Sequence, residues 1–115
     1  MKYKGYCHCK KVSYEVDLEL GQVISCNCSH CQIKGLLLSF VGGDAFTLTG
    51  GAEDLTSYRF NKKVIDHLFC KHCGVESFAK GKDKEDRDTV AINVRCLEGV
   101  EIDKLVITEV DGKNW

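Results

Sequence analysis

Cysteine is the residue type that most constrains how this chain can fold. The chain has 115 residues and eight cysteines, seven of which fall into three short clusters. Residues 7–9 read CHC, residues 26–31 read CNCSHC and residues 70–74 read CKHCG, while Cys96 stands apart. A tight C-x-x-C turn lets two thiolates converge on one metal ion, and a C-x-C in an extended segment points both side chains to the same side.

Counting ligands divides the clustered cysteines into a group of four and a group of three. A closed structural zinc site needs four ligands, and the first and third clusters together supply them. They are Cys7, Cys9, Cys70 and Cys73. Such a site would join the N-terminus to the middle of the chain by closing a long loop. The middle cluster offers three ligands, which with one open position is typical of a catalytic zinc. These are Cys26, Cys28 and Cys31.

Other uses of the cysteines remain open at the level of the sequence. Cys28 and Cys31 could join Cys70 and Cys73 in a zinc ribbon, although the gap between the two pairs is long for a ribbon. Eight cysteines could also form four disulfides. An iron–sulfur cluster on Cys26, Cys28, Cys31 and one further thiol is a third possibility, and a redox pair at Cys70 and Cys73 is a fourth.

Several residues near the clusters are expected to have ordinary structural roles. Cys96 follows an apolar strand and is interpreted as a small buried hydrophobe, with a role as fourth ligand or reactive thiol as the alternative. Asn93 is interpreted as a buried amide that bonds to the backbone, although it could orient a substrate. The histidines in or beside the clusters are expected to bond to nearby backbone or face water rather than bind metal. They are His8, His30, His67 and His72.

The charge balance argues against two classes of partner. Sixteen lysines and arginines face seventeen acidic residues, so neither nucleic acid nor an anionic membrane is expected as a partner. No apolar run approaches the ~20 residues that span a bilayer. No secretory signal follows Met1, so we expect a cytoplasmic protein, where cysteines serve as metal ligands or reactive thiols more often than as disulfides.

The hydrophobic pattern predicts a single all-β domain that covers residues 1–115. Short alternating or β-branched segments are bounded by Gly, Asn and Asp, and proline is absent. About eight short strands in antiparallel sheets are expected. The clearest are residues 12–16, 46–49, 55–60, 64–69, 89–94 and 105–110, and the apolar residues 36–41 are expected to form a buried strand. Residues 80–88 are interpreted as a charged, solvated hairpin tip.

With these residues identified, the chain resembles the glutathione-dependent formaldehyde-activating enzyme family, which includes the centromere protein V domain. The family patterns G-x-C-x-C-G-x-V-x-Y, C-x-C-S-x-C-[RQ], F-C-x-x-C-G, N-V-R-C-L and D-G-x-N-W recur in order along the chain. They appear as GYCHCKKVSY (residues 5–14), CNCSHCQ (26–32), FCKHCG (69–74), NVRCL (93–97) and DGKNW (111–115). Lys10 departs from the pattern, because the family usually has glycine there.

The resemblance implies a β-tent fold of antiparallel sheets stapled by two zinc ions per chain. It assigns the structural zinc to the group of four cysteines and the catalytic zinc to the group of three. The implied activity is that of S-(hydroxymethyl)glutathione synthase, a carbon–sulfur lyase that acts on glutathione and formaldehyde. The rival hypotheses are a binding module in which both zincs are structural and a nucleic-acid-binding zinc ribbon. The sequence names neither the substrate nor the oligomeric state.

Overall fold

Two β-sheets account for most of the fold. The structure is a computed structural model that describes residues 1–21, 23–59 and 65–111. The smaller sheet has the order β1 (Lys2–Tyr6), β2 (Ser13–Asp17) and β5 (Phe46–Gly50). The larger sheet has the order β10 (Ile107–Val110), β3 (Val23–Cys26), β4 (Leu38–Gly42), β9 (Asp88–Asn93), β8 (Phe78–Lys82), β7 (Asp66–Cys70) and β6 (Leu55–Tyr58). One short helix, α1 (Ser29–Lys34), follows β3.

The prediction of an all-β fold is confirmed, and the clearest alternating segments are strands. The segments predicted from residue patterns correspond to β2, β4, β5, β6, β7, β9 and β10. Strands β8 and β9 pair from Phe78↔Ile92 to Lys82↔Asp88, so residues 83–87 form the tip of a hairpin as expected, whereas residues 80–82 and 88 of the predicted tip belong to the strands. The predicted strands 55–60 and 64–69 extend into residues 60–64, which lie outside the described residues, as do residues 112–115 of the DGKNW motif.

The structure has strands, an α-helix and one strand pairing that the sequence did not predict. Strands β1, β3 and β8 and helix α1 are additional. Strand β10 pairs with β3 in parallel, whereas the other strand pairs described are antiparallel. Of the helices within residues 1–21, 23–59 and 65–111, none has the length and apolar character needed to cross a lipid bilayer.

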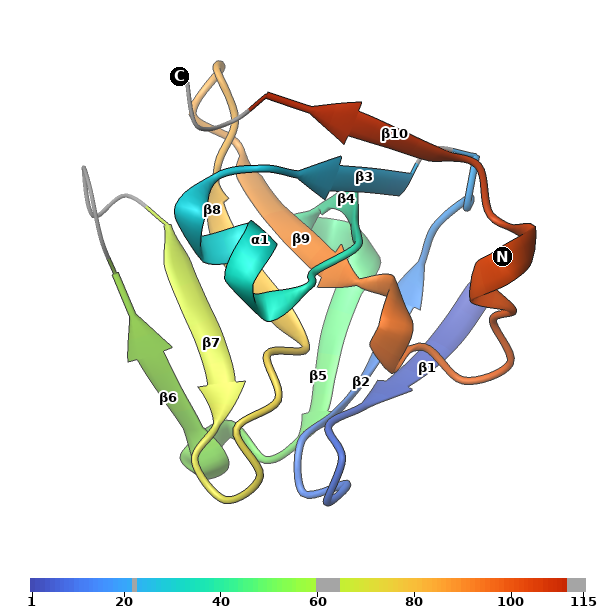
Figure 1. Cartoon of the computed structure of the whole chain (residues 1–115). Coiled ribbons are helices and arrows are strands. Elements are labelled where there is room, and N and C mark those ends of the chain that lie inside the picture. Colours follow the sequence, from blue (N-terminus) through green and yellow to red (C-terminus); the bar gives the residue numbers. More distant parts are fainter. Residues whose placement is uncertain (22, 60–64, 112–115) are drawn as a thin grey trace.

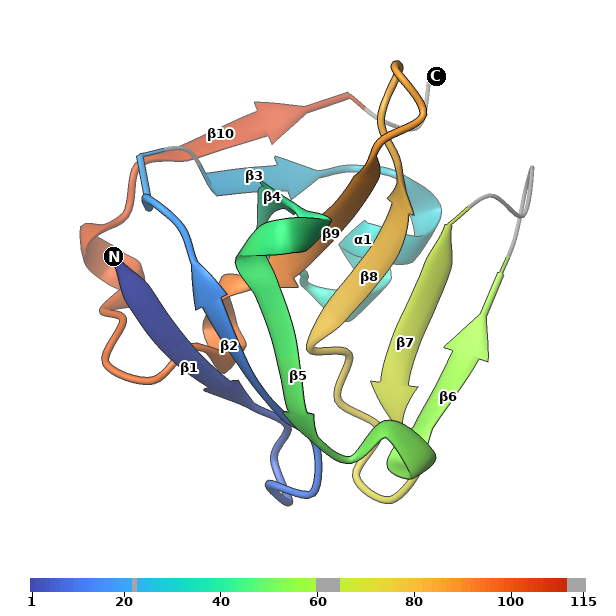
Figure 2. The ribbon, with the colours of Figure 1, turned by 180° about the vertical axis from the view of Figure 1, so that it is seen from behind.

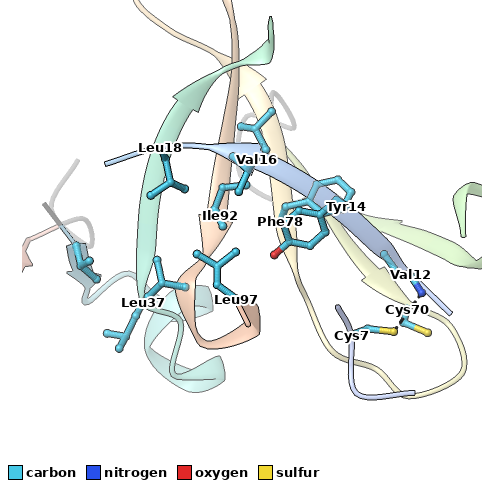
Figure 3. Close-up of a cluster of buried hydrophobic side chains, with 13 residues drawn as sticks. Cys7, Val12, Tyr14, Val16, Leu18, Leu37, Cys70, Phe78, Ile92 and Leu97 are labelled. Atoms are coloured by element: carbon cyan, nitrogen blue, oxygen red, sulfur yellow. Dashed lines mark hydrogen bonds between the residues drawn. The ribbon is translucent and has the colours of Figure 1, made fainter. Parts of the chain in front are cut away.

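The main hydrophobic core lies between the two sheets. Tyr14 and Val16 of β2 meet Phe78 of β8 and Ile92 of β9, and all four are at most 1% exposed. The ring centroids of Tyr14 and Phe78 are 5.6 Å apart, and Phe46 lies 5.2 Å from Tyr14 and 4.7 Å from Phe78. Such aromatic pairs contribute about 0.5–1.5 kcal/mol each beyond the burial of their area. Figure 3 shows Tyr14 beside Phe78, with the sulfur atoms of Cys7 and Cys70 close together at one end of the same cluster.

A second, smaller core lies beneath α1. Cys31 of the helix, Leu36 and Leu38 are buried there, and Ala91 of β9 packs against them. Because side chains alternate along a strand, Val90 and Ile92 enter the main core while Ala91 faces the helix. Figures 1 and 2 accordingly show α1 and the smaller sheet on opposite sides of the larger sheet. Leu36, Leu37 and Leu38 are buried as predicted, but Phe40 is 52% exposed, so the apolar segment is only partly core.

Gly5 is required by the close packing of β1 on the tyrosine of β2. Gly5 pairs with Tyr14 across the sheet, and a Cβ at Gly5 would lie 2.1 Å from Cζ of the Tyr14 ring. The ring cannot withdraw without disturbing Phe46 and Phe78, against which it packs. The sequence of β1 is therefore constrained by a side chain on its neighbour.

We expect Gly5→Ala to lower the free energy of unfolding by about 1–3 kcal/mol, because the methyl group overpacks the core. The measurement is urea denaturation of the metal-replete protein. Gly21→Ala is the matched control, since a Cβ at Gly21 meets no atom within 4 Å, and its effect should stay within about 0.5 kcal/mol. Equal effects of the two substitutions would contradict the packing of Tyr14 on Gly5.

Candidate metal centres

The first and third cysteine clusters converge in space. The sulfur atoms of Cys7, Cys9, Cys70 and Cys73 all lie within 4.8 Å of one another. Cys9 Sγ is 3.6 Å from both Cys7 Sγ and Cys70 Sγ. Zinc–sulfur bonds of about 2.3 Å in a tetrahedral site place sulfurs about 3.8 Å apart, whereas a disulfide bond is only about 2.05 Å long. The spacing fits four ligands of one metal ion, and all eight cysteines of the chain are free.

Two tight turns bring these sulfurs together. After Cys70, the amide of Gly74 donates to the Cys70 carbonyl at 2.8 Å, and Gly74 has φ +80°. The glycine that follows Cys73 thus provides a left-handed backbone conformation, as its position predicts. In the other turn, the amide of Lys10 donates to the Cys7 carbonyl at 3.1 Å, and Lys10 itself has φ +67°. The turn keeps a left-handed conformation even though lysine replaces the family's glycine, at a cost of about 1–2 kcal/mol.

Backbone amides and neighbouring thiols set the charge of this cluster. The Val12 amide donates to Cys7 Sγ and the His72 amide to Cys70 Sγ, each at 3.4 Å. Burial raises the pKa of the Cys73 thiol, but hydrogen bonds from backbone and from neighbouring thiols lower that pKa to about 6. A backbone hydrogen bond from Lys11 lowers the pKa of Cys9, yet burial and the other thiols raise it to about 11. The Cys73 thiol therefore ionises more readily than the Cys9 thiol.

The middle cluster forms a separate group of three sulfurs. The Sγ atoms of Cys26, Cys28 and Cys31 lie within 4.8 Å of one another. The Cys28 amide donates to Cys26 Sγ at 3.5 Å. Burial raises the pKa of Cys28, but hydrogen bonds from the Cys31 amide and the two neighbouring thiols outweigh burial and lower that pKa. Burial is the main cause of the raised pKa of Cys31. The chemistry of the donor set fits a thiolate-bound ion such as zinc.

Local structure around α1 holds these three sulfurs. Cys28 is the N-cap of the helix, and its Sγ accepts from the Cys31 amide at 3.4 Å, so the two sulfurs face each other across the first turn. Gly35 ends the helix with φ +67°. Cys26 is the last residue of β3, where it pairs with Val110 of β10. The strand β10 at the far end of the chain thus helps to position Cys26.

A cavity opens beside the group of three. Its volume is about 540 Å³, and Cys26 and Cys31 form part of its wall. Arg95 also lines it, and Arg95 Nε donates to the carbonyl oxygen of Gly35 at 3.2 Å. The acidic residues Glu109 and Asp111 lie in the same lining. The lining of the cavity therefore includes two cysteines of the group of three, one arginine and two acidic residues.

A larger cavity of about 960 Å³ lies elsewhere, over β4, β5, β8 and β9. Its lining includes Phe40, Phe46, Lys80 and Arg87 and, among the described residues, none of the clustered cysteines. Size alone would favour this cavity as a binding site. The chemistry favours the smaller one, because two cysteines of the group of three form part of its wall.

Asn93 and Cys96 are two further residues considered from the sequence. Asn93 is 7% exposed, its Nδ2 donates to the Glu76 carbonyl, and its Oδ1 accepts from the Arg95 amide, which confirms its interpretation as a buried amide bonded to backbone. Cys96 is partly buried in the 3-10 turn η3 (Val94–Cys96). Among the residues that the structure describes, Cys96 belongs to neither sulfur group.

The histidines divide into two kinds. His8 is exposed, and His72 Nε2 lies 2.7 Å from Asp54 Oδ1 at an exposed position. His30 and His67 are instead buried beside the carboxylate of Glu76. The expectation that these two histidines face water is wrong, because residues distant in sequence bury both rings against an acid. No local spacing could have signalled the Glu76 contact.

The structure also bears on the alternative uses of the cysteines. Cys70 and Cys73 group with Cys7 and Cys9 rather than with Cys28 and Cys31, so the zinc-ribbon pairing does not match the geometry. Four disulfides do not match it either, because every cysteine is free. The three sulfurs of the middle cluster lie together in the described chain with no fourth cysteine in their group.

The different pKa values of Cys73 and Cys9 predict that the two thiols react at different rates in the reduced, metal-free protein. Because the Cys73 pKa is lowered to about 6, its thiol should be mostly ionised at neutral pH and lose reactivity as the pH falls through 6. Cys9, with its pKa raised to about 11, should react slowly until the medium is strongly alkaline. Iodoacetamide labelling across pH, read by peptide mass spectrometry, measures both rates. In denaturant the two profiles should merge, and faster labelling of Cys9 than Cys73 in the folded protein at pH 7 would contradict the assignment.

Comparison with known proteins agrees with this arrangement. A protein of Rhodobacter sphaeroides, known from its crystal structure, is 30% identical and superimposes with a TM-score of 0.80; the match covers 91% of this chain and 99% of the other. Residues 2–106 match the family described as glutathione-dependent formaldehyde-activating enzyme. The match spans both sulfur groups and the fold that brings them together. This chain therefore belongs to the glutathione-dependent formaldehyde-activating enzyme family.

Proposed function

We propose that the protein is a zinc-dependent enzyme of the carbon–sulfur lyase type that joins a small thiol, such as glutathione, to an aldehyde, such as formaldehyde. Family membership supports an activity of this general kind. The observation that carries the proposal for this chain is the position of Cys26 and Cys31 in the wall of a cavity. A metal held there would be reached from solvent by a small substrate.

Two zinc ions with different roles fit the two sulfur groups. In the group of four, Cys7 and Cys70 are 3% and 0% exposed, and four protein ligands close a tetrahedral site, so we assign it a structural role. In the group of three, a zinc ion would supply Lewis acidity, by which it binds a substrate thiol as the thiolate or polarises a carbonyl. Free thiol ligands persist in a reducing compartment, so we place the protein in the cytoplasm.

The proposed reaction needs no oxidant, reductant or further co-reactant. The thiol sulfur forms a bond to the carbonyl carbon of the aldehyde, the carbonyl π electrons move to oxygen, and the thiol proton ends on that oxygen. The reverse step breaks the same carbon–sulfur bond. The task of the chain is to hold both substrates in reach of each other, since positioning removes much of the entropic barrier of a bimolecular step.

The charges of the cavity suit the two ends of glutathione. Glutathione carries two carboxylates and one ammonium group around its thiol. Arg95 can bind a carboxylate, and its bond to the Gly35 carbonyl fixes the guanidinium at the cavity wall next to the end of α1. Glu109 of β10 and Asp111, which follows that strand, can receive the ammonium group. This complementarity favours glutathione or a similar zwitterionic thiol over an apolar one.

We expect Cys28→Ser to lose one equivalent of zinc and at least about a hundredfold in turnover, because it removes a metal ligand. Serine is itself a good N-cap, so α1 should remain folded. Turnover is measured by NMR exchange between glutathione and isotope-labelled formaldehyde, and zinc by elemental analysis.

Cys96→Ser is the matched control for this substitution, since it makes the same atomic change at a cysteine outside both sulfur groups. It should retain zinc and turnover. Undiminished turnover in folded Cys28→Ser would contradict a catalytic role for this zinc. If the unaltered protein holds two zinc ions and shows no turnover, the alternative function is favoured, a binding module in which both zinc ions are structural.

A second test concerns substrate recognition. Arg95→Gln should raise KM for glutathione about tenfold, because a charged hydrogen bond contributes about 1.5–3 kcal/mol. The kcat/KM value for 2-mercaptoethanol, which has no carboxylate, should change little. Arg87→Gln, which alters the arginine of the larger cavity, serves as the control and should affect neither substrate. A similar loss with both thiols would show that Arg95 does not recognise the carboxylate.

A further inference from the structure

Three buried side chains that the proposed reaction does not use meet beneath α1. His30 lies on α1, His67 on β7, and Glu76 on the segment between β7 and β8. They are 8%, 8% and 5% exposed. Figure 1 shows α1 in front of the larger sheet next to β7. The three residues come from three separate elements, and the fold alone brings them together.

The geometry of the three matches the ligand sphere of a metal ion. One nitrogen from each histidine and one oxygen of Glu76 all lie within 4.8 Å of one another. His30 Nε2 is 3.3 Å from Glu76 Oε1, and His67 Nδ1 is 3.4 Å from Glu76 Oε2. Metal bonds of about 2.0–2.1 Å place neighbouring nitrogen and oxygen ligands about 2.9–3.4 Å apart in octahedral or tetrahedral sites. An ordinary N–H···O hydrogen bond is shorter, near 2.9–3.0 Å.

The position of the rings adds to this match. The centroids of the two imidazoles are 4.0 Å apart, and their planes are inclined by 43°, so the rings converge on the carboxylate from two directions. Tyr58 stacks on His30 at 5.9 Å, on the side of the neighbouring strand β6. Convergent nitrogen donors around a buried carboxylate are typical of sites for divalent first-row transition ions.

Lys34 is the group that competes with a metal ion for the carboxylate. Its ammonium nitrogen lies 3.0 Å from Glu76 Oε1 and 5.0 Å from the centre of the Phe69 ring. A carboxylate that is 2% exposed needs a nearby cation, which Lys34 supplies. The lysine side chain is 32% exposed, so its flexible stem can carry the charge to solvent when another cation binds Glu76. Lys34 therefore links the buried carboxylate of Glu76 to the solvent-exposed surface.

We propose that His30, His67 and Glu76 form a third metal site, which binds a divalent first-row transition ion through two imidazole nitrogens and one carboxylate. The site is distinct in chemistry from both sulfur groups, because its donors are nitrogen and oxygen. Three protein ligands leave further coordination positions for water. The proposal does not rest on the proposed thiol–aldehyde activity.

The test is cobalt binding to protein whose sulfur sites already hold zinc. Zinc binds more tightly than cobalt, so the added cobalt should leave the sulfur-bound zinc in place. We expect one equivalent of Co²⁺ by equilibrium dialysis, with the weak visible absorption of nitrogen and oxygen ligands and without a sulfur-to-cobalt charge-transfer band. Glu76→Gln and His67→Asn should each weaken cobalt binding by at least about tenfold while keeping the zinc content.

Two further variants make the test specific. His72→Asn is the matched control, because it alters an exposed histidine–carboxylate pair outside the cluster, and it should bind cobalt as the unaltered protein does. Lys34→Met removes the competing ammonium and should tighten cobalt binding about tenfold. Cobalt that binds neither the unaltered protein nor Lys34→Met, binding that survives Glu76→Gln unchanged, or a sulfur-to-cobalt band would each overturn the proposal.

Discussion

The meeting of four sulfur atoms from two distant turns is the contact on which the arrangement of the sheets depends. Cys9 and Cys70 are 61 positions apart, yet their sulfurs lie 3.6 Å from each other. One turn leads from β1 into β2 of the smaller sheet, and the other leads out of β7 of the larger sheet. Clustered thiolates repel one another unless a cation or protons neutralise them. A metal ion at this point would therefore hold the two sheets together as well as balance the charge.

The hydrophobic core and the candidate functional sites lie on opposite faces of the larger sheet. One face packs on the smaller sheet around Tyr14 and Phe78 and forms the main core. The other face is covered by α1, which carries Cys31 and His30 on neighbouring positions. The six-residue helix α1 thus contributes one residue to the sulfur group of three and one to the cluster of His30, His67 and Glu76. Strand β10 extends the same sheet and, with β3, forms a wall of the cavity beside the sulfurs. Changes in that cavity need not disturb the core.

The sequence predicts a strand or helix well only where the segment is long enough to show a clear hydrophobic pattern. Residues 12–16 alternate clearly, and β2 forms there, because one face of the strand is buried and the other is exposed. Strand β8 was missed because its Lys-Gly-Lys end resembles a charged loop, and α1 because six residues give too few turns for a helical period. The parallel pairing of β10 with β3 has no local signal, since it joins segments that are more than eighty positions apart.

The sequence by itself determined which cysteines within one cluster can share an ion, whereas the fold decided that the first cluster meets the third. A C-x-C or C-x-x-C spacing holds two sulfurs within reach of one ion in almost any fold, so local geometry carries the information. Only the tertiary structure decided that His30 and His67 enclose Glu76 and that Arg95 lines a cavity beside Cys26. These contacts join residues on different strands and turns. They form only when α1 packs on the larger sheet, so the spacing of the residues along the chain does not predict them.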